Sequence, residues 1–283
     1  MEYTTIISTD ELENNLNQPE WVIIDCRFNL LKRDWGIQDY QISHIPGALY
    51  AHLDNDLSGS IGLKTGRHPL PGSRNFYSTL SNWGISSSKQ VVVYDTTGGS
   101  IAVRLWWLLK FYQHQLVAVL NGGFYKWIRE NRPTRPGIEN PKESCELLMK
   151  KANLDMLITT RDLESIYYDP KYRLIDARAP ERYQGKIELI DPVAGHIPGA
   201  LNRFHEDNLG SDGTFKSIDQ LNKEFSLLLG ETPANNVIVY CGSGVTSCHH
   251  LLALEMIGKP GARLYAGSWS EWIRDKNHPI EKG

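Results

Sequence analysis

The chain has 283 residues, about twice the roughly 150 of a typical domain, so its length favours two domains. Its 41% hydrophobic and 22% charged residues are ordinary for a globular protein. The formal net charge of -3 argues against the general basic face that nucleic acid or an anionic membrane would attract.

The N-terminal sequence MEYTTIISTDELENNL has no basic segment followed by an apolar one, so we expect no secretory signal. No segment approaches the roughly 20 apolar residues of a membrane span. The four cysteines (Cys26, Cys145, Cys241 and Cys248) are too few for a disulfide scaffold and indicate reduced thiols in a cytoplasmic protein.

Four motifs occur twice in the same order, at offsets between 145 residues (Trp127 to Trp272) and 152 residues (His44 to His196). This period far exceeds the roughly 20–50 residues of a solenoid repeat and predicts a duplicated domain. The pairs are WVIIDCR (21–27) with YRLIDAR (172–178), SHIPGALY (43–50) with GHIPGALN (195–202), VVVYD (91–95) with VIVYC (237–241), and LNGGFYKWIRENRP (120–133) with YAGSWSEWIRDKNHP (265–279).

The Pro-rich stretch after the first copy predicts a semi-extended linker. We therefore expect an N-terminal domain at 1–135, a linker at 136–154 and a C-terminal domain at 155–283.

Short apolar segments alternate with helical ones in each copy. Residues 91–95, 116–120 and 237–241 lack polar alternation, which is typical of strands buried on both faces. Residues 104–112 and 247–257 have the length and composition of helices, and Ser217 to Gln220 fits a capping box that opens another. The alternation predicts an α/β fold in each domain, a mostly parallel sheet covered by helices. Ligands then lie beyond the carboxyl ends of the strands.

Cys241 directly follows one of these strands and begins the sequence CGSGVTS. Gly242 and Gly244 allow backbone N–H groups to turn inward as a nest for an anion, and a helix that begins near Val245 points its positive end at the same place. Lowering a thiol pKa from about 8.5 to about 6.5 requires roughly 2.7 kcal/mol. Two or three such hydrogen bonds and the helix dipole supply it, so we predict a nucleophilic thiolate rather than a structural cysteine.

The tandem HIPGA motifs, the CGSGVT loop and the GSW–EW motif resemble the two-domain rhodanese and 3-mercaptopyruvate sulfurtransferase family, over nearly the whole chain. The resemblance implies two rhodanese-like folds, each a parallel five-stranded sheet flanked by helices. It also implies that Cys241 takes sulfane sulfur from a small donor as a persulfide and passes it to cyanide, a thiol or thioredoxin. No cofactor is expected. In the first copy, Asp95 occupies the position that corresponds to Cys241. An aspartate cannot hold transferable sulfur, so the N-terminal domain is expected to be inactive.

The loop sequence distinguishes two kinds of donor. Thiosulfate-preferring members of the family carry basic residues where this chain has Gly242 and Ser243, so the resemblance favours 3-mercaptopyruvate, with thiosulfate as the alternative. We expect the following loop residues, Gly244, Val245 and Thr246, to contact the donor as well.

In related enzymes the serine at the position of Ser243 pairs with the histidine of the N-terminal HIPG motif, which is His44 here. The related enzymes also have an aspartate upstream of this histidine, and Asp34 is the candidate for it. His196 occupies the same motif in the second copy, so a structural role for both histidines remains open.

Arg182 in ERYQG matches the arginine of the family's GRY/GRF motif and is expected to bind the donor's carboxylate, unless it is one of several surface arginines. Arg178 belongs to the repeated Asp-x-Arg motif, which favours a structural role. The family usually carries a second arginine before HIPGA. The segment KIELIDPVAG lacks it, and Lys186 and Arg104 are the candidate substitutes.

Three other interpretations were weighed against sulfur transfer. Cys248, His249 and His250 are adjacent on a predicted helix and point about 100° apart, so we expect helix packing rather than a metal site. A dual-specificity phosphatase needs an arginine six residues after its cysteine. This chain has Ser247 at that position, so we do not expect phosphatase activity. A non-catalytic sulfur-carrier or docking module remains an alternative, although such modules often lack the cysteine that is present here.

Overall fold

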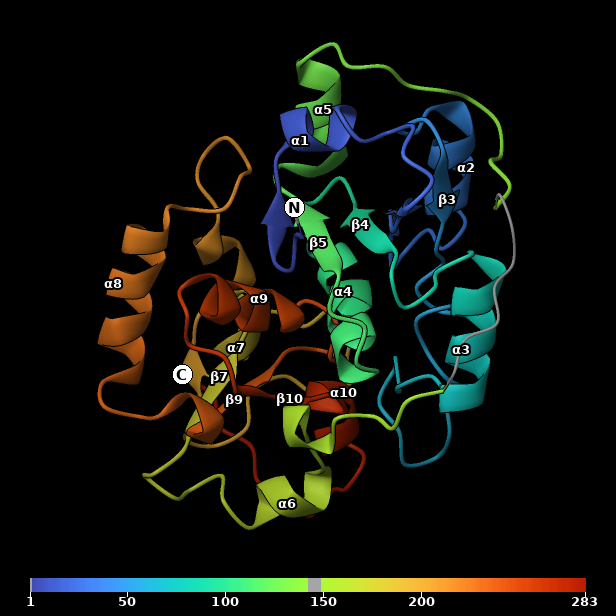
Figure 1. The fold of residues 1–283 in the computed structure, drawn as a ribbon. Coiled ribbons are helices and arrows are strands. Elements are labelled where there is room, and N and C mark those ends of the chain that lie inside the picture. Colours follow the sequence, from blue (N-terminus) through green and yellow to red (C-terminus); the bar gives the residue numbers. More distant parts are fainter. Residues whose placement is uncertain (1, 142–148) are drawn as a thin grey trace. The chain divides into compact units, whose positions relative to one another are not determined.

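A computed structural model describes residues 2–141 and 149–283 (Figure 1). Cys145 and the middle of the predicted linker lie outside the described residues. The chain divides into two compact units. Unit 1 comprises residues 1–59, 71–152 and 209–215, and unit 2 comprises residues 60–70, 153–208 and 216–283.

Each unit is a parallel five-stranded sheet with helices around it (Figure 1). In unit 1 the elements are β1 (Ile6–Ile7), α1 (Thr9–Glu13), β2 (Trp21–Asp25), α2 (Trp35–Ile42), β3 (Ala48–Tyr50), α3 (Ser73–Asn82), β4 (Gln90–Tyr94), α4 (Ala102–Phe111), β5 (Val117–Leu120) and α5 (Gly123–Arg129). In unit 2 they are η1 (Leu154–Met156), β6 (Leu157–Ile158), α6 (Thr160–Glu164), β7 (Arg173–Asp176), α7 (Pro180–Tyr183), β8 (Leu201–Asn202), η2 (His205–Asn208), α8 (Ile218–Leu229), η3 (Ala234–Asn236), β9 (Val237–Tyr240), α9 (Cys248–Met256), β10 (Arg263–Tyr265) and α10 (Ser268–Trp272).

The strand order is the same in both sheets, β1-β5-β4-β2-β3 and β6-β10-β9-β7-β8, and every pairing is parallel. The predicted α/β fold with two such sheets is therefore confirmed. All residues of β4, β5 and β9 are buried, in keeping with their continuous apolar sequences. Ser217 and Gln220 form the predicted capping box at the start of α8.

Each half of the sequence contributes one short segment to the unit that the other half forms, and the two segments occupy matching places in the repeat. Residues 60–70 lie between β3 and α3, and residues 209–215 lie between β8 and α8. Neither segment contains a helix or strand. The first of them reaches unit 2 with the sequence SIGLKTGRHPL.

A buried ion pair fixes the end of the second strand in each copy. In unit 1, Arg27 donates to both carboxylate oxygens of Asp25 and, at 2.7 Å, to the carbonyl of Ser43. Arg178 repeats this arrangement on Asp176 in unit 2. Side chains of both arginines are about 1% exposed, so these pairs are structural parts of the fold, as predicted for Arg178.

The helix start after β9 differs from the expectation. The α-helix α9 begins at Cys248, three residues beyond the predicted start near Val245. The intervening residues form tighter turns, in which the N–H groups of Cys248 and His249 bond carbonyls three residues earlier. The loop itself, rather than the first turn of an α-helix, therefore surrounds Cys241.

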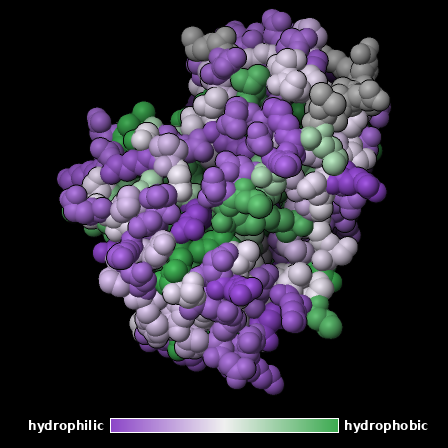
Figure 2. Space-filling view, turned by 60° about the horizontal axis from the view of Figure 1, so that its bottom comes forward, coloured by the Kyte–Doolittle hydropathy of each residue, from purple (hydrophilic) through white to green (hydrophobic). Residues whose placement is uncertain are grey.

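Hydrophilic residues cover most of the face shown in Figure 2, with hydrophobic residues gathered into smaller patches. Among the helices that the structure describes, none is both long and apolar enough to cross a membrane.

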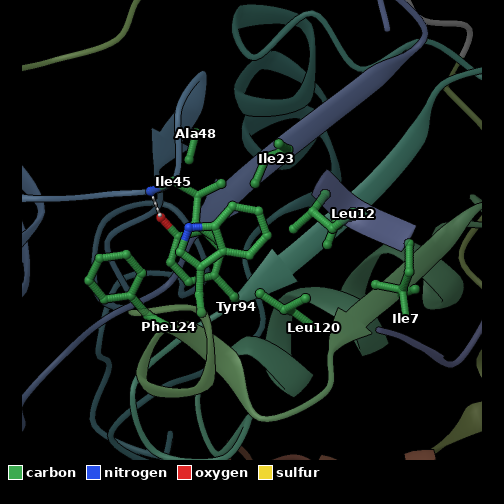
Figure 3. Close-up of a cluster of buried hydrophobic side chains, with 11 residues drawn as sticks. Ile7, Leu12, Ile23, Ile45, Ala48, Tyr94, Leu120 and Phe124 are labelled. Carbon is green, nitrogen blue, oxygen red and sulfur yellow. Dashed lines mark hydrogen bonds between the residues drawn. The ribbon is translucent and has the colours of Figure 1, made fainter. Parts of the chain in front are cut away.

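A tyrosine at the end of each fourth strand satisfies the backbone of the HIPG motif. The hydroxyl of Tyr94 accepts a hydrogen bond from the N–H of Ile45 at 3.2 Å, within the apolar core of unit 1 (Figure 3). Tyr240 and Ile197 repeat this bond at 3.2 Å in unit 2. All four residues are fully buried.

Tyr94→Phe and Tyr240→Phe each leave one buried N–H without a partner, which we expect to cost about 1–3 kcal/mol. Hydrogen exchange read by mass spectrometry should accelerate at Ile45 in the first variant and at Ile197 in the second. Tyr125→Phe, at a half-exposed tyrosine, is the control and should leave both segments protected. Unchanged exchange at both sites would contradict the structural role of these hydroxyls.

Candidate active site

Cys241 lies immediately beyond β9, a strand paired on both sides within the sheet of unit 2. It is 2% exposed. The loop that follows depends on Gly244, whose φ is +73° and whose missing Cβ would lie 2.3 Å from the carbonyl oxygen of Ala266. Only glycine combines this backbone conformation with so close an approach. The Gly-rich sequence thus folds a tight turn around the sulfur.

Burial raises the pKa of the Cys241 thiol, but hydrogen bonds to the thiolate outweigh it and the pKa lies below its ordinary value. Hydroxyls of Ser247 and Thr246 contribute most, followed by the backbone N–H groups of Ser243 and Ser247. Ser247 is fully buried, and its hydroxyl has no hydrogen-bond partner among the described residues. A thiolate on Cys241 is the acceptor that this hydroxyl would stabilise.

The corresponding loop of unit 1 has an acid in the place of the sulfur. The Asp95 carboxylate accepts hydrogen bonds of 2.7–2.9 Å from four backbone N–H groups, those of Thr97, Gly99, Ile101 and Ala102. Two of these donors, the N–H groups of Thr97 and Ile101, lie two and six residues after Asp95. The N–H groups of Ser243 and Ser247 lie at the same distances along the chain from Cys241. The repeat has thus preserved an anion cradle in both copies, and Asp95 fills the first one permanently.

Ser243 pairs with a histidine from the segment 60–70. The Nδ1 atom of His68 lies 2.7 Å from the hydroxyl oxygen of Ser243, and the two residues are 4% and 6% exposed. Backbone hydrogen bonds anchor the segment to unit 2: the N–H groups of Gly66 and Arg67 donate to side-chain oxygens of Glu271 and Ser270, respectively.

The predicted pairing of Ser243 with His44 is therefore wrong. The Nδ1 atom of His44 meets the carbonyl oxygen of Tyr40 at 2.8 Å, and the two rings stack with centroids 4.1 Å apart. In the other copy, the Nδ1 atom of His196 meets the carbonyl oxygen of Tyr183 at 2.8 Å, and the two rings stack with centroids 3.7 Å apart. The repeated geometry shows that both HIPG histidines join a helix to the turn that follows it.

Asp34, the candidate aspartate, is exposed at the start of α2 and makes no side-chain hydrogen bond or ion pair among the described residues. In the part of the chain that the structure describes, no hydrogen bond or ion pair links Asp34 to His44 or Ser243.

Arg182, the predicted carboxylate-binding residue, projects from α7 toward the loop but is already engaged. Its Nε and NH2 atoms donate to Glu188 at 2.8–3.0 Å, and NH2 also donates to Asp191 at 3.1 Å. A Cβ on Gly242 would lie 3.7 Å from NH1 and from NH2. NH1, which has no hydrogen bond among the described residues, is the group that remains for an incoming anion.

Arg67 is a second arginine beside the loop, although the segment before HIPGA contains none. Its NH2 atom lies 2.7 Å from where a Cβ on Gly242 would be, and its NH1 donates to Asp191. The two candidate substitutes do not fill this role: Arg104 is buried in unit 1, where it donates to the carbonyl of Leu57, and Lys186 is exposed.

Sequence reasoning missed Arg67 and His68 because it assigned residues 1–135 to a separate domain. The available signal was the sequence GRHPLP, a basic pair in a Gly- and Pro-rich stretch that has no counterpart in the second copy.

The histidines after Cys248 belong to the packing of α9. His249 and His250 are fully buried, and the Nδ2 atom of Asn208 lies 3.0 Å from the Nδ1 atom of each. Among the described residues, no group of three or more His, Cys, Asp or Glu side chains is arranged to hold a metal.

A buried cysteine in a loop of N–H and hydroxyl donors, at the carboxyl end of a central parallel strand, has the surroundings that stabilise a thiolate. The family model of the rhodanese-like domain matches residues 8–130 and 159–275. The chain therefore belongs to the rhodanese-like family, and it is a sulfurtransferase.

Full-length relatives agree with this assignment. A protein of Pseudomonas aeruginosa described as a "probable 3-mercaptopyruvate sulfurtransferase" is 41% identical over 286 residues, covering 100% of both chains. The mouse thiosulfate sulfurtransferase is 30% identical over 283 residues, covering 96% of this chain and 93% of its own. The structure of SseA from Escherichia coli, described as a 3-mercaptopyruvate sulfotransferase, superposes with a TM-score of 0.80 at 30% identity, over 95% of this chain and 100% of that one.

Ser247→Ala removes the hydroxyl that most strongly lowers the pKa of Cys241. A lost hydrogen bond to a charged group is worth about 1.5–3 kcal/mol, so the thiol pKa should rise by roughly one unit or more. Alkylation of Cys241 by iodoacetamide, followed against pH, should slow near neutral pH and recover at high pH. Ser226→Ala, at an exposed serine, is the control, and an unshifted midpoint in Ser247→Ala would refute the assignment.

Proposed function

We propose that this protein transfers sulfur from 3-mercaptopyruvate through a persulfide on Cys241 to a thiol or cyanide. The observation that carries the choice of donor is the pairing of Ser243 with His68 in a loop that contains no basic residue. This pair offers a proton to a leaving enolate. Sulfite, the leaving group of thiosulfate, departs as a stable anion and has little need of one.

In the first step, the Cys241 thiolate attacks the sulfur atom of the donor and the donor's carbon–sulfur bond breaks. The electron pair of that bond becomes the enolate of pyruvate, and the sulfur stays on Cys241 as the persulfide Cys–S–SH. With a proton on Nδ1, His68 donates to Ser243, whose own hydroxyl hydrogen is then free to bond the donor's carbonyl oxygen as it gains charge. One proton added to the enolate gives pyruvate.

The donor's carboxylate is expected to lie beside Gly242. The free NH1 of Arg182 and the NH2 of Arg67 both approach this glycine, and guanidinium groups bind carboxylates well. Gly242 leaves the room that a side chain would take. The predicted loop contacts from Gly244, Val245 and Thr246 remain part of this proposal, with Thr246 acting through the thiolate.

In the second step, an acceptor thiolate or cyanide attacks the outer sulfur of the persulfide and releases the Cys241 thiolate. Thioredoxin is a candidate acceptor, and the cytoplasm predicted from the sequence supplies reduced thiols. The structure contains Cys26, Cys241 and Cys248 as free thiols.

Thiosulfate remains the second candidate donor, because relatives such as the mouse enzyme carry that name. A ratio of kcat/KM values for the two donors decides between them, and we expect it to favour 3-mercaptopyruvate.

Incubation with 3-mercaptopyruvate should add the mass of one sulfur atom to the intact protein, and cyanide should remove it. Cys241→Ser should abolish both the adduct and turnover. Cys26→Ala is the matched control, since burial holds the pKa of the Cys26 thiol well above its ordinary value and that thiol should not react. The absence of any adduct from either donor would refute the proposed function.

Ser243→Ala should lower kcat for 3-mercaptopyruvate by roughly 100-fold, because general acid assistance typically contributes at least that factor. The same variant should change kcat for thiosulfate by only a few fold. Steady-state kinetics on both donors measure the difference, and His68→Asn should reproduce it. Equal losses on both donors would place Ser243 in loop structure rather than in proton donation.

A further inference from the structure

The two arginines beside the loop are bridged by one buried carboxylate. Asp191, 8% exposed, accepts from NH1 of Arg67 through one oxygen and from NH2 of Arg182 through the other. Its place in the sequence is IDPVAGHIPG, immediately before the second HIPG motif.

A second carboxylate fixes Arg182 from the other edge. Glu188 accepts from Nε and NH2 of Arg182 and also from the backbone N–H groups of Ile190 and Asp191, at 2.9 and 3.0 Å. Burial opposes charge on Glu188, but these bonds keep its pKa below the ordinary value. Glu188 thus shapes the segment that holds Asp191 in place.

The formal charges of this cluster cancel. Burial raises the pKa of Asp191, while Arg67 and Arg182 act to lower it. With both acids ionised, the two positive charges of Arg67 and Arg182 meet two negative charges on Asp191 and Glu188. Arg178, whose NH1 lies 3.5 Å from Glu188, adds a third positive charge, and Asp176 balances it. An anion that approaches the free edges of the two arginines therefore meets Asp191 directly behind them.

We propose that Asp191 is a specificity-determining residue that selects donors by charge, disfavouring dianions such as thiosulfate relative to monoanions such as 3-mercaptopyruvate. The inference rests on the proposed function, because it concerns the donor subsite of the same loop. A dianion is repelled by Asp191 about twice as strongly as a monoanion in the same place. The neutral cluster gives the dianion no compensating excess of positive charge.

Removing the charge of Asp191 should change the ratio of the activities on thiosulfate and 3-mercaptopyruvate. The ratio is informative even if both activities also change because Arg67 and Arg182 are held less firmly. In Asp191→Asn, the ratio of kcat/KM for thiosulfate to kcat/KM for 3-mercaptopyruvate should rise about tenfold. One unit of charge at roughly 6 Å gives this factor at an effective dielectric constant between the ~20 of a protein surface and the ~80 of water. The rise should shrink as salt is added.

Two variants separate charge from geometry. Asp191→Glu keeps the charge while moving the carboxylate, and its donor ratio should stay near that of the unaltered protein. Asp219→Asn removes the same charge from an exposed position on α8 and should also leave the ratio unchanged. A ratio that is unaltered in Asp191→Asn, or raised equally in Asp191→Glu, would overturn the proposal.

A binding measurement distinguishes failure of this inference from failure of the proposed function. Pyruvate and sulfate, a monoanion and a dianion, should each slow the alkylation of Cys241 by iodoacetamide, whether or not the protein turns over a donor. In Asp191→Asn, protection by sulfate should strengthen about tenfold relative to protection by pyruvate. An unchanged relative protection, or no protection by either anion, would overturn the charge-selection role even in a protein that transfers sulfur.

Discussion

The position directly after the fourth strand of each sheet is surrounded by inward-pointing backbone N–H groups, and both loops depend on a negative charge at that point. In unit 1 the Asp95 carboxylate accepts four of them. In unit 2 the group at that point is the Cys241 thiol, whose ionised form is stabilised by two of the matching N–H groups and by the hydroxyls of Ser247 and Thr246. The lowered pKa of Cys241 therefore follows from the loop's own need for an anion, and no neighbouring base is required.

Because the acid satisfies the loop as well as a thiolate does, the first copy can lose its nucleophile and keep its fold. The surrounding structure is the same in both copies: the buried Asp-x-Arg pair, the tyrosine hydroxyl that bonds the HIPG backbone, and the histidine stacked on a tyrosine. These groups stabilise the carboxyl end of the sheet in both units. The sulfur chemistry that we propose depends instead on residues in which the two copies differ, above all Cys241 in the place of Asp95.

That division explains what the sequence alone predicted. The duplicated motifs predicted both sheets, and the Gly-rich loop predicted the environment of Cys241, because these features depend on local order along the chain. The assignment of His44 failed for a reason visible in the repeat: a histidine that makes the same contacts in both copies serves the shared fold. Arg67 and His68 come from an irregular segment between β3 and α3 that joins unit 2. Neither periodicity nor turn chemistry specifies where such a segment packs.

The carboxylates around Arg67 and Arg182 have a further consequence for the nucleophile. Arg67 attracts the Cys241 thiolate, and two uncompensated arginines would lower the thiol pKa beyond what the loop achieves. A thiolate of very low pKa is abundant but attacks sulfur slowly, since nucleophilicity falls with basicity. Asp191 and Glu188 cancel that excess charge while keeping the free edges of both arginines at Gly242. In the proposed site, the cluster would therefore bind an anion close to Cys241 while the loop's own hydrogen bonds set the reactivity of the sulfur.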